Sequence, residues 1–214
     1  KTFRAPSFEV VKECGLDHLS SLGYSAEGLI CYQRADLSDL NLKRLPPSLA
    51  DNSSVSELQL QNNKLRSADC ISSLMRLTRL DLSGNLLQRL PRCAAEGLQW
   101  MDASRNLLTE LAGCELKNLT TLRLARNRLS TLEGAALPCL QVLDVSHNRL
   151  AQLGFLRTLP SLTELYAAGN RLTEACGLDG HPSLTVVHLR DNLLTGLPPL
   201  RCPRLYTLNL RGND

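Results

Sequence analysis

The sequence predicts an α/β repeat protein, a solenoid in which every turn adds one short strand to a parallel sheet. Asparagines recur at steps of 22, 21, 21, 21, 22, 22 and 21 residues over most of the chain. The frame LxLxxNxL surrounds them, as in residues 80–87 and 122–129. A unit of this length buries its apolar side only against its neighbours. The asparagines are Asn63, Asn85, Asn106, Asn127, Asn148, Asn170, Asn192 and Asn213.

The LxL segment predicts the strand, and the asparagine predicts its end. Alternation with a period of two places Leu122 and Leu124 inward and Arg123 in solvent. A short amide side chain can turn inward and bond the backbone groups that a bend leaves unpaired. We therefore expect the asparagine amides to stack as a ladder beside the sheet.

The residues after each asparagine predict a compact return. Leucines then follow at steps of three, as in Leu150, Leu153, Leu156 and Leu159, and a proline often precedes the next strand. This spacing favours a helical or 3₁₀ turn.

These motifs resemble the leucine-rich repeat family over residues 30–214. The period of 21 or 22 residues resembles its short intracellular subclass, typified by the regulatory subunit of type 1 protein phosphatase and including axonemal dynein light chain. The resemblance implies a parallel β-sheet on a concave face and short helical or 3₁₀ turns on a convex face. We expect about nine repeats, the last of them incomplete.

Both ends depart from the repeat. Residues 1–29 predict a helical cap, with one helix after Ser7 and a second that starts at Asp17 and stops at Gly23. Leu40 stands where the first ladder asparagine would be, as in an atypical terminal repeat. At the other end we expect further chain or a partner to cover Leu208 and Leu210.

Composition limits the classes of partner. The formal charge is only +3, so the net charge does not indicate nucleic acid or a membrane surface as the partner. No apolar run is long enough for a membrane span. The eight cysteines include no CxxC pair, and Cys93 and Cys114 occupy core positions of their repeats. We expect free, buried thiols, no metal, and an intracellular location, cytoplasmic or cytoskeletal.

The sequence offers no catalytic constellation. His18 falls in the expected cap, His181 in a convex turn, and His147 and His188 on the strand side. None belongs to a known nucleophile motif, and no glycine-rich phosphate loop is present. We expect a protein that is not an enzyme and carries no cofactor.

The concave face is the expected partner-binding site. Trp100, the only tryptophan, falls on a solvent-facing strand position, and exposed tryptophan and tyrosine often dominate interfaces. The alternative is surface packing of Trp100 on Arg79 and Thr121. Arg123 falls between Asp102 and Asp144, where its guanidinium group can pair with both carboxylates. The expected site residues are Trp100, Arg123, Tyr166, His188, Asp102, Asp144, Val142 and Val186.

A basic flank beside the ladder supports an alternative partner. Arginines stand directly before or after the ladder asparagines, at Arg105, Arg126, Arg128, Arg149 and Arg171. RNA or an acidic tail can dock on such a stripe, although a solvated edge gives the same pattern.

The sequence thus predicts a non-catalytic scaffold that binds one or more proteins inside a larger intracellular complex. Cytoskeletal, ciliary and phosphatase complexes follow from the resemblance alone. A module associated with RNA or ribonucleoprotein and a secreted or effector-type repeat protein are the alternatives.

Overall fold

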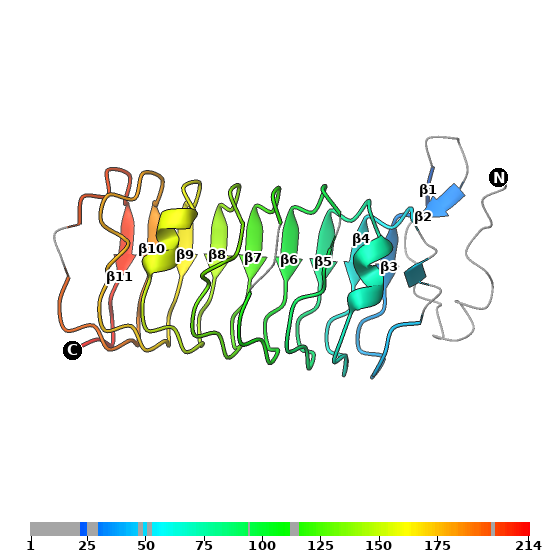
Figure 1. Cartoon of the computed structure of the whole chain (residues 1–214), viewed down its shortest axis with the longest axis horizontal. Coiled ribbons are helices and arrows are strands. Elements are labelled where there is room, and N and C mark those ends of the chain that lie inside the picture. The colour runs from blue at the N-terminus through cyan, green and yellow to red at the C-terminus, as the bar shows by residue number, and fades with distance from the viewer. Residues whose placement is uncertain are drawn as a thin grey trace.

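Nine short strands form one parallel sheet, in the order β11-β10-β9-β8-β7-β6-β5-β4-β3. The computed structural model describes residues 22–24, 30–46, 49–50, 53–93, 95–111, 116–197 and 200–214. Each turn places its strand beside the previous one, so the turns stack along the long axis (Figure 1). The predicted fold class, a parallel solenoid, is confirmed. The strands are β3 (Arg34–Asp36), β4 (Glu57–Gln59), β5 (Arg79–Asp81), β6 (Trp100–Asp102), β7 (Thr121–Arg123), β8 (Val142–Asp144), β9 (Glu164–Tyr166), β10 (Val186–His188) and β11 (Thr207–Asn209).

A small antiparallel pair precedes the parallel sheet. β1 (Leu22–Tyr24) pairs with β2 (Ile30–Tyr32), with Gly23 opposite Cys31. The prediction of a helix that stops at Gly23 is therefore wrong at its end, because this segment pairs with β-branched and aromatic residues that favour strands. The remainder of the expected helices, before Leu22, lies outside the described residues.

The LxL alternation produces the strands as predicted. In β6 the middle residue, Met101, is fully buried, while Trp100 and Asp102 are half-buried on the outer face. Each strand is in register with the next, so that Trp100 lies beside Thr121 and Asp102 beside Arg123. The apolar positions of successive turns therefore form one continuous core of leucines.

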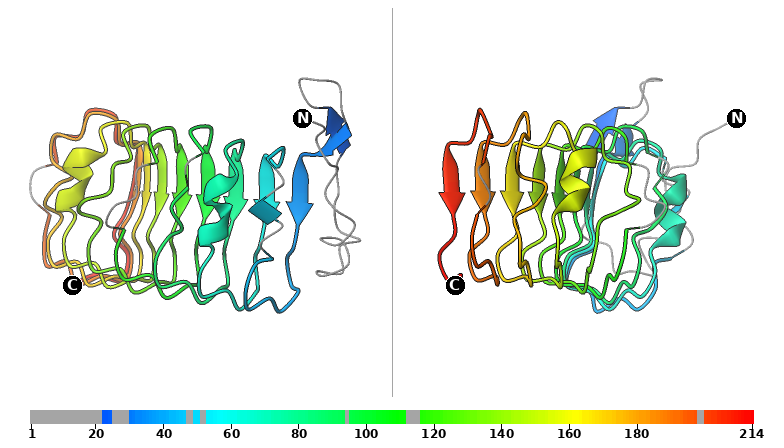
Figure 2. Two further views of the ribbon diagram at one scale, coloured as in Figure 1. Left: turned by 45° about the vertical axis from the view of Figure 1, so that its right-hand side comes forward. Right: turned by 60° about the vertical axis from the view of Figure 1, so that its left-hand side comes forward.

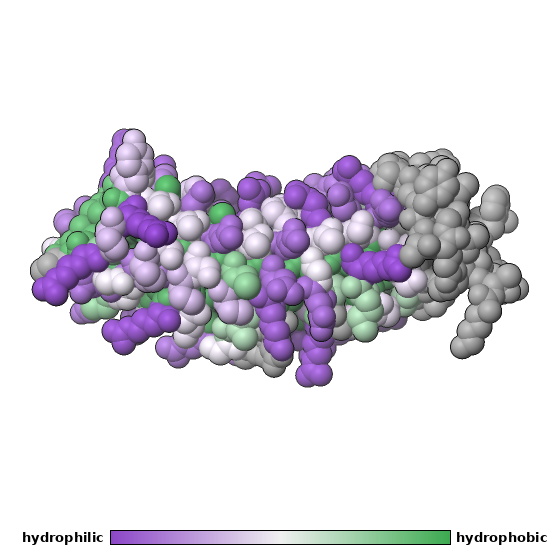
Figure 3. Space-filling model, turned by 90° about the horizontal axis from the view of Figure 1, so that it is seen from above, coloured by the Kyte–Doolittle hydropathy of each residue, from purple (hydrophilic) through white to green (hydrophobic). Residues whose placement is uncertain are grey.

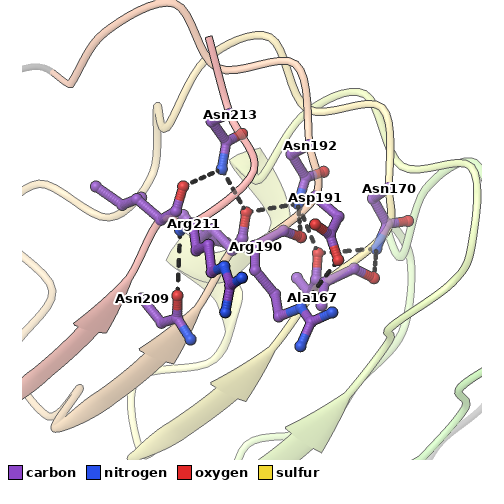
Figure 4. Close-up of polar contacts among 11 residues, drawn as sticks. Ala167, Asn170, Arg190, Asp191, Asn192, Asn209, Arg211 and Asn213 are labelled. Carbon is purple, nitrogen blue, oxygen red and sulfur yellow. Dashed lines mark hydrogen bonds and ion pairs between the residues drawn. The ribbon is translucent and has the colours of Figure 1, made fainter.

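The asparagine ladder is confirmed in detail. The Nδ2 atom of Asn127 donates to the carbonyls of Ala103 and Leu124, both at 2.9 Å, and its Oδ1 accepts the Leu108 N–H at 3.0 Å. Each amide thus satisfies backbone groups in its own turn and in the previous one. Figure 4 shows the same arrangement at Asn170, Asn192 and Asn213.

The returns contain less helix than the leucine spacing predicts. The 3₁₀ helices η2 (Asp69–Ser73) and η3 (Gly154–Thr158) lie on the side opposite the strands (Figures 1 and 2). In η3, Leu156 and Phe155 are buried, and the step of three between leucines matches the 3₁₀ period. Within the described residues, no helix is long and apolar enough to cross a membrane.

The cysteine prediction is confirmed in one part and wrong in another. All five cysteines whose side chains are described are unpaired, namely Cys70, Cys93, Cys139, Cys176 and Cys202. None of these five is fully buried, and Cys139 and Cys176 are exposed. All five lie in the segments between strands rather than at the buried middle position of a strand. Partial burial raises the pKa of Cys93 and of Cys70. The side chains of Cys14, Cys31 and Cys114 lie outside the described ones.

The last strand is less covered than the others. Leu208 and Leu210 are half-buried, whereas Val187 and Leu189 of the preceding turn are fully buried. Figure 3 shows hydrophobic residues gathered at this end of the molecule. The expectation that further chain or a partner covers Leu208 and Leu210 stays a prediction.

Candidate protein-binding face

The first and third residues of each strand form one outward surface, which we call the strand face. The pairing registers place them in two columns that match the sequence alignment. Because neighbouring strands are hydrogen-bonded, these side chains project from a fixed backbone. The first column is Arg34, Glu57, Arg79, Trp100, Thr121, Val142, Glu164, Val186 and Thr207, and the second is Asp36, Gln59, Asp81, Asp102, Arg123, Asp144, Tyr166, His188 and Asn209.

Trp100 lies between two arginines on the strand face. The guanidinium carbon of Arg79, on β5, is 3.5 Å from the centroid of its ring, and that of Arg123, on β7, is 5.8 Å away. Cations over the face of an indole ring are attracted by its quadrupole. The indole is therefore half-buried and held in place by Arg79, which agrees in part with the surface-packing alternative.

A second aromatic cluster lies nearer the C-terminus. The rings of Tyr166 and His188 have centroids 5.1 Å apart and are tilted by 49°. The Tyr166 hydroxyl donates to Oε2 of Glu164 at 2.9 Å, and this hydrogen bond is the main reason that the pKa of Tyr166 is raised. The hydroxyl is thus fixed as a donor to a carboxylate of its own strand.

The aromatic side chains among the expected site residues fall into two clusters. Trp100 on β6 and Tyr166 on β9 are three strand spacings apart, about 14 Å. Val142 and Asp144, both half-buried on β8, lie between them, and Val186 on β10 lies beside Glu164. A partner that contacts both clusters therefore has to span several turns.

The aspartates of the second column have a structural role that sequence reasoning missed. Oδ1 of Asp102 accepts the N–H of Ser104 at 2.8 Å, and Oδ1 of Asp144 accepts that of Ser146 at 2.9 Å. This bond to the residue two positions later supports the bend that follows the strand. The repeated DxS spacing, also present at residues 36–38 and 81–83, is the sequence signal for it.

Arg123 does not pair with the two neighbouring aspartates as the sequence suggested. Among the described residues, Arg123 forms no ion pair with Asp102 or Asp144, and both Arg79 and Arg123 point to Trp100 instead. Asp102 lies directly beside Asp81. The pKa of Asp102 is raised, mainly by burial and also by the Asp81 charge, so its ionised form is disfavoured.

The basic flank is a separate surface beside the ladder. Arg105, Arg126 and His147 directly precede ladder asparagines and adopt left-handed backbone conformations, with φ of 55°, 59° and 56°. Glycine occupies the same position in other turns, at Gly84 and Gly169. The remaining members of the flank, Arg128, Arg149 and Arg171, are exposed, and none of the five arginines forms an ion pair with a described residue.

The histidines occupy three different environments. His188 lies on the strand face, and His147 lies in the ladder turn after β8 rather than on a strand. His181 is buried on the convex side, where its Nε2 donates to the Leu159 carbonyl at 3.1 Å. Among the described residues, no three His, Cys, Asp or Glu side chains are placed to hold a metal ion.

Comparison with known proteins agrees with this geometry. The family model described as leucine rich repeat matches residues 117–172. The fold is a leucine-rich-repeat solenoid. Solenoids of this kind typically act as non-catalytic binding scaffolds in protein–protein interaction. No curated protein sequence matches the chain.

Several solved leucine-rich-repeat structures are similar to it. Internalin C2 from Listeria monocytogenes is 22% identical with a TM-score of 0.75, and the match covers 93% of this chain and 89% of that one. YopM, a leucine-rich effector protein from Yersinia pestis, is 26% identical with a TM-score of 0.70, over 85% of this chain and 50% of YopM. TLR13, solved in complex with ssRNA13, is 30% identical with a TM-score of 0.62, over 70% of this chain and 23% of TLR13.

Proposed function

We propose that this leucine-rich-repeat solenoid is a non-catalytic adaptor, or a regulatory or structural subunit, that binds a protein partner through its strand face. The observation that carries the proposal is Trp100, held between Arg79 and Arg123 on hydrogen-bonded strands. Tryptophan and arginine are the side chains most often found to dominate interfaces. Here Trp100, Arg79 and Arg123 lie together on the outer side of the sheet.

Rigidity is the physical basis of binding. Side chains on paired strands, and an indole already stacked on an arginine, lose little conformational freedom when a partner docks. Less of the interaction free energy is then spent on ordering the site. The same argument favours a partner that contacts several turns at once.

The charge of the strand face indicates the chemistry of the partner. Its two columns contain three arginines and six carboxylates, a formal charge of −3, although the chain as a whole carries +3. A partner segment rich in lysine or arginine complements this surface. Burial, and to a smaller extent the Asp81 charge, raise the pKa of Asp102, and a cation placed between Asp81 and Asp102 stabilises the ionised carboxylates.

The setting proposed is a larger intracellular complex in the cytoplasm or on the cytoskeleton. The period of 21 or 22 residues and the unpaired thiols support it. Cytoskeletal, ciliary and phosphatase complexes are proposed by resemblance to the short intracellular subclass.

The basic flank supports a second candidate, an RNA- or ribonucleoprotein-associated module. Its cations carry no ion pair among the described residues, and TLR13 is a similar structure solved with single-stranded RNA. Binding through such a flank weakens steeply as salt rises. Retention on an RNA column that is lost at moderate salt, and lost in an Arg126→Glu, Arg149→Glu variant, would favour this candidate.

A secreted or effector-type repeat protein is the third candidate, favoured by the similarity to YopM. Mass spectrometry of the native protein without reduction separates it from the intracellular proposal. Intact disulfides would favour secretion, and free thiols would favour a reducing compartment.

The experiment that tests the leading proposal is affinity purification of the full-length protein. Three baits are compared: wild type, the strand-face variant Trp100→Ala, Tyr166→Ala, and the flank variant Arg126→Glu, Arg149→Glu. We expect the principal partner to be lost with the strand-face variant and kept with the flank variant. The opposite pattern would move the binding site to the flank.

A further inference from the structure

A groove lies on the flank that follows the asparagine ladder, at the N-terminal end of the solenoid and away from the strand face. Residues of three successive turns line it, and its volume is about 650 Å³. This size is typical of a binding site. Four cationic side chains line the groove, Lys43, Arg44, Lys64 and Arg66, together with the apolar side chains of Leu45 and Leu86.

The cations of the groove are not neutralised by the residues around them. Asp69 is the only carboxylate among the described residues of its lining, and it is already paired with Arg89, whose Nη2 lies 3.1 Å from Oδ2. The Ser67 hydroxyl also donates to Oδ2 at 2.7 Å. These contacts, with the Ser67 hydrogen bond foremost, lower the pKa of Asp69. Among the described residues, none of the four lining cations forms an ion pair.

The groove also has an apolar wall. Leu86 is 38% exposed, which makes it one of the few large hydrophobic side chains of the described surface that are open to solvent. Leu45, two turns earlier, also lines the groove and is half-buried. A ligand that satisfies the whole groove therefore combines negative charge with an apolar group.

We propose that this groove binds an acidic protein segment that carries carboxylates on both sides of an aliphatic or aromatic side chain. The guanidinium groups of Arg44 and Arg66 suit carboxylates in bidentate geometry. The aliphatic or aromatic side chain packs on Leu45 and Leu86. The lining cations come from neighbouring turns, about 4.8 Å apart in the sheet, and so suit several separate charges along an extended segment.

A lone phosphate group fits the groove less well. Phosphate sites commonly use the backbone N–H groups at the start of a helix. Here the adjacent helix, η2, is a short 3₁₀ helix that begins with the carboxylate of Asp69. A lone phosphate would also leave the apolar side chains of Leu45 and Leu86 without a partner.

The groove and the strand face have opposite charge. A segment that complements the groove is acidic, whereas the strand face carries three arginines and six carboxylates. The two surfaces therefore select different partners, and one chain can hold both at the same time. This inference does not depend on the proposed function of the strand face.

The test is fluorescence anisotropy with a labelled peptide of alternating glutamate and leucine, at low salt, on the full chain. A glutamine–leucine peptide is the control for charge, and pyrophosphate is added as a competitor. We expect the glutamate–leucine peptide to bind and the glutamine–leucine peptide not to bind. Absence of binding by the first peptide, or displacement by pyrophosphate at lower concentration than by unlabelled peptide, would overturn the proposal.

Two charge-reversal variants locate the site. Lys43→Glu, Arg66→Glu lies in the groove, and Arg128→Glu, Arg149→Glu lies on the same flank outside it. We expect the first variant to lower the affinity for the glutamate–leucine peptide at least about tenfold and the second to change that affinity by less than about twofold. Equal losses would show general attraction to positive charge and would overturn the assignment. Circular dichroism confirms that both variants are folded.

A third variant tests the apolar wall. Leu86→Ser should lower the affinity for the glutamate–leucine peptide and leave the affinity for a polyglutamate peptide unchanged. Equal binding of the glutamate–leucine peptide to wild type and Leu86→Ser would remove the apolar contact from the proposal. Retention of the strand-face partner by all three variants separates this result from that of the affinity purification.

Discussion

Several residues of this solenoid look like functional residues in the sequence but have structural roles. Asp102 and Asp144 form part of an acidic column, yet each uses one oxygen to bind the N–H of the second following residue. His181 is a potential catalytic group by residue type, yet it is buried and bonded to the Leu159 carbonyl. Sequence position alone could not separate these roles, because both depend on burial and on hydrogen-bond partners.

His181 makes stability depend on pH. Burial lowers its pKa below the ordinary value of 6.5, so the unfolded chain takes up the proton first as the pH falls. Its contribution to stability is complete above pH 6.5 and is lost progressively below that pH. We expect urea denaturation to show a smaller fall in stability between neutral and acidic pH for His181→Gln than for wild type.

The exposed His147 is the control for this measurement. His147→Gln should keep the pH dependence of the wild type. An unchanged pH dependence in His181→Gln would contradict the assignment of the effect to His181.

Gly84 is favoured by its backbone conformation and by a close neighbour. Its φ is +66°, and an added Cβ would lie 2.6 Å from Oδ1 of Asn62 in the previous turn. Gly84→Ala should therefore destabilise the protein by about 1 to 2 kcal/mol. Gly154→Ala is the matched control, because nothing lies within 4 Å of its added Cβ. Chemical denaturation that gave equal stabilities for the two variants would refute this account.

At the scale of the element, the repeating unit was predictable because its parts are local. The LxL alternation and the following asparagine fix the strand and its end within a few residues, as Met101 and Asn106 show. The convex returns were less predictable, because leucines at steps of three are compatible with both 3₁₀ helices and irregular turns. Only the packing of Ile71 and of Phe155 shows which turns become helical.

The ladder asparagine is the element's most sensitive position. Asn127 makes three hydrogen bonds to backbone groups, and its amide is buried. Asn127→Ala leaves these groups without partners, at a cost of about 3 kcal/mol in the free energy of unfolding. Thermal or chemical denaturation measures the loss.

Asn118 provides the comparison. It is exposed and donates a single bond, to the Glu96 carbonyl at 2.7 Å. Asn118→Ala should cost less than about 1 kcal/mol. A loss in Asn127→Ala no larger than this would mean that the ladder does not stabilise the bend.

At the scale of the molecule, the sequence predicted which residues share a face but not how they interact there. The repeat alignment placed Trp100 and Arg123 on the outer side of adjacent strands, and the pairing register agrees. It could not show that Arg79 stacks on the indole, since this depends on side-chain conformation. It also missed the groove at Lys43 and Arg66, whose cations come from neighbouring turns.

The whole molecule separates its charges between surfaces. The strand face is acidic, and the flank beside the ladder is basic over much of its length, at the groove and again from Arg105 to Arg171. Such separation allows a rigid solenoid to hold unlike partners on adjacent sides. It also means that one charge-reversal variant cannot show which surface binds a partner, because each surface needs a variant of its own.

The central claim, that the strand face binds a protein through Trp100, is tested most directly by the affinity of the purified partner for Trp100→Ala, measured by isothermal titration calorimetry. Tyr206→Ala is the control, since Tyr206 is 92% exposed and lies outside the strand face. The account predicts a loss of about 2 kcal/mol, roughly a thirtyfold rise in Kd, for Trp100→Ala in a protein that remains folded, and no change for Tyr206→Ala. An unchanged Kd for Trp100→Ala would contradict it.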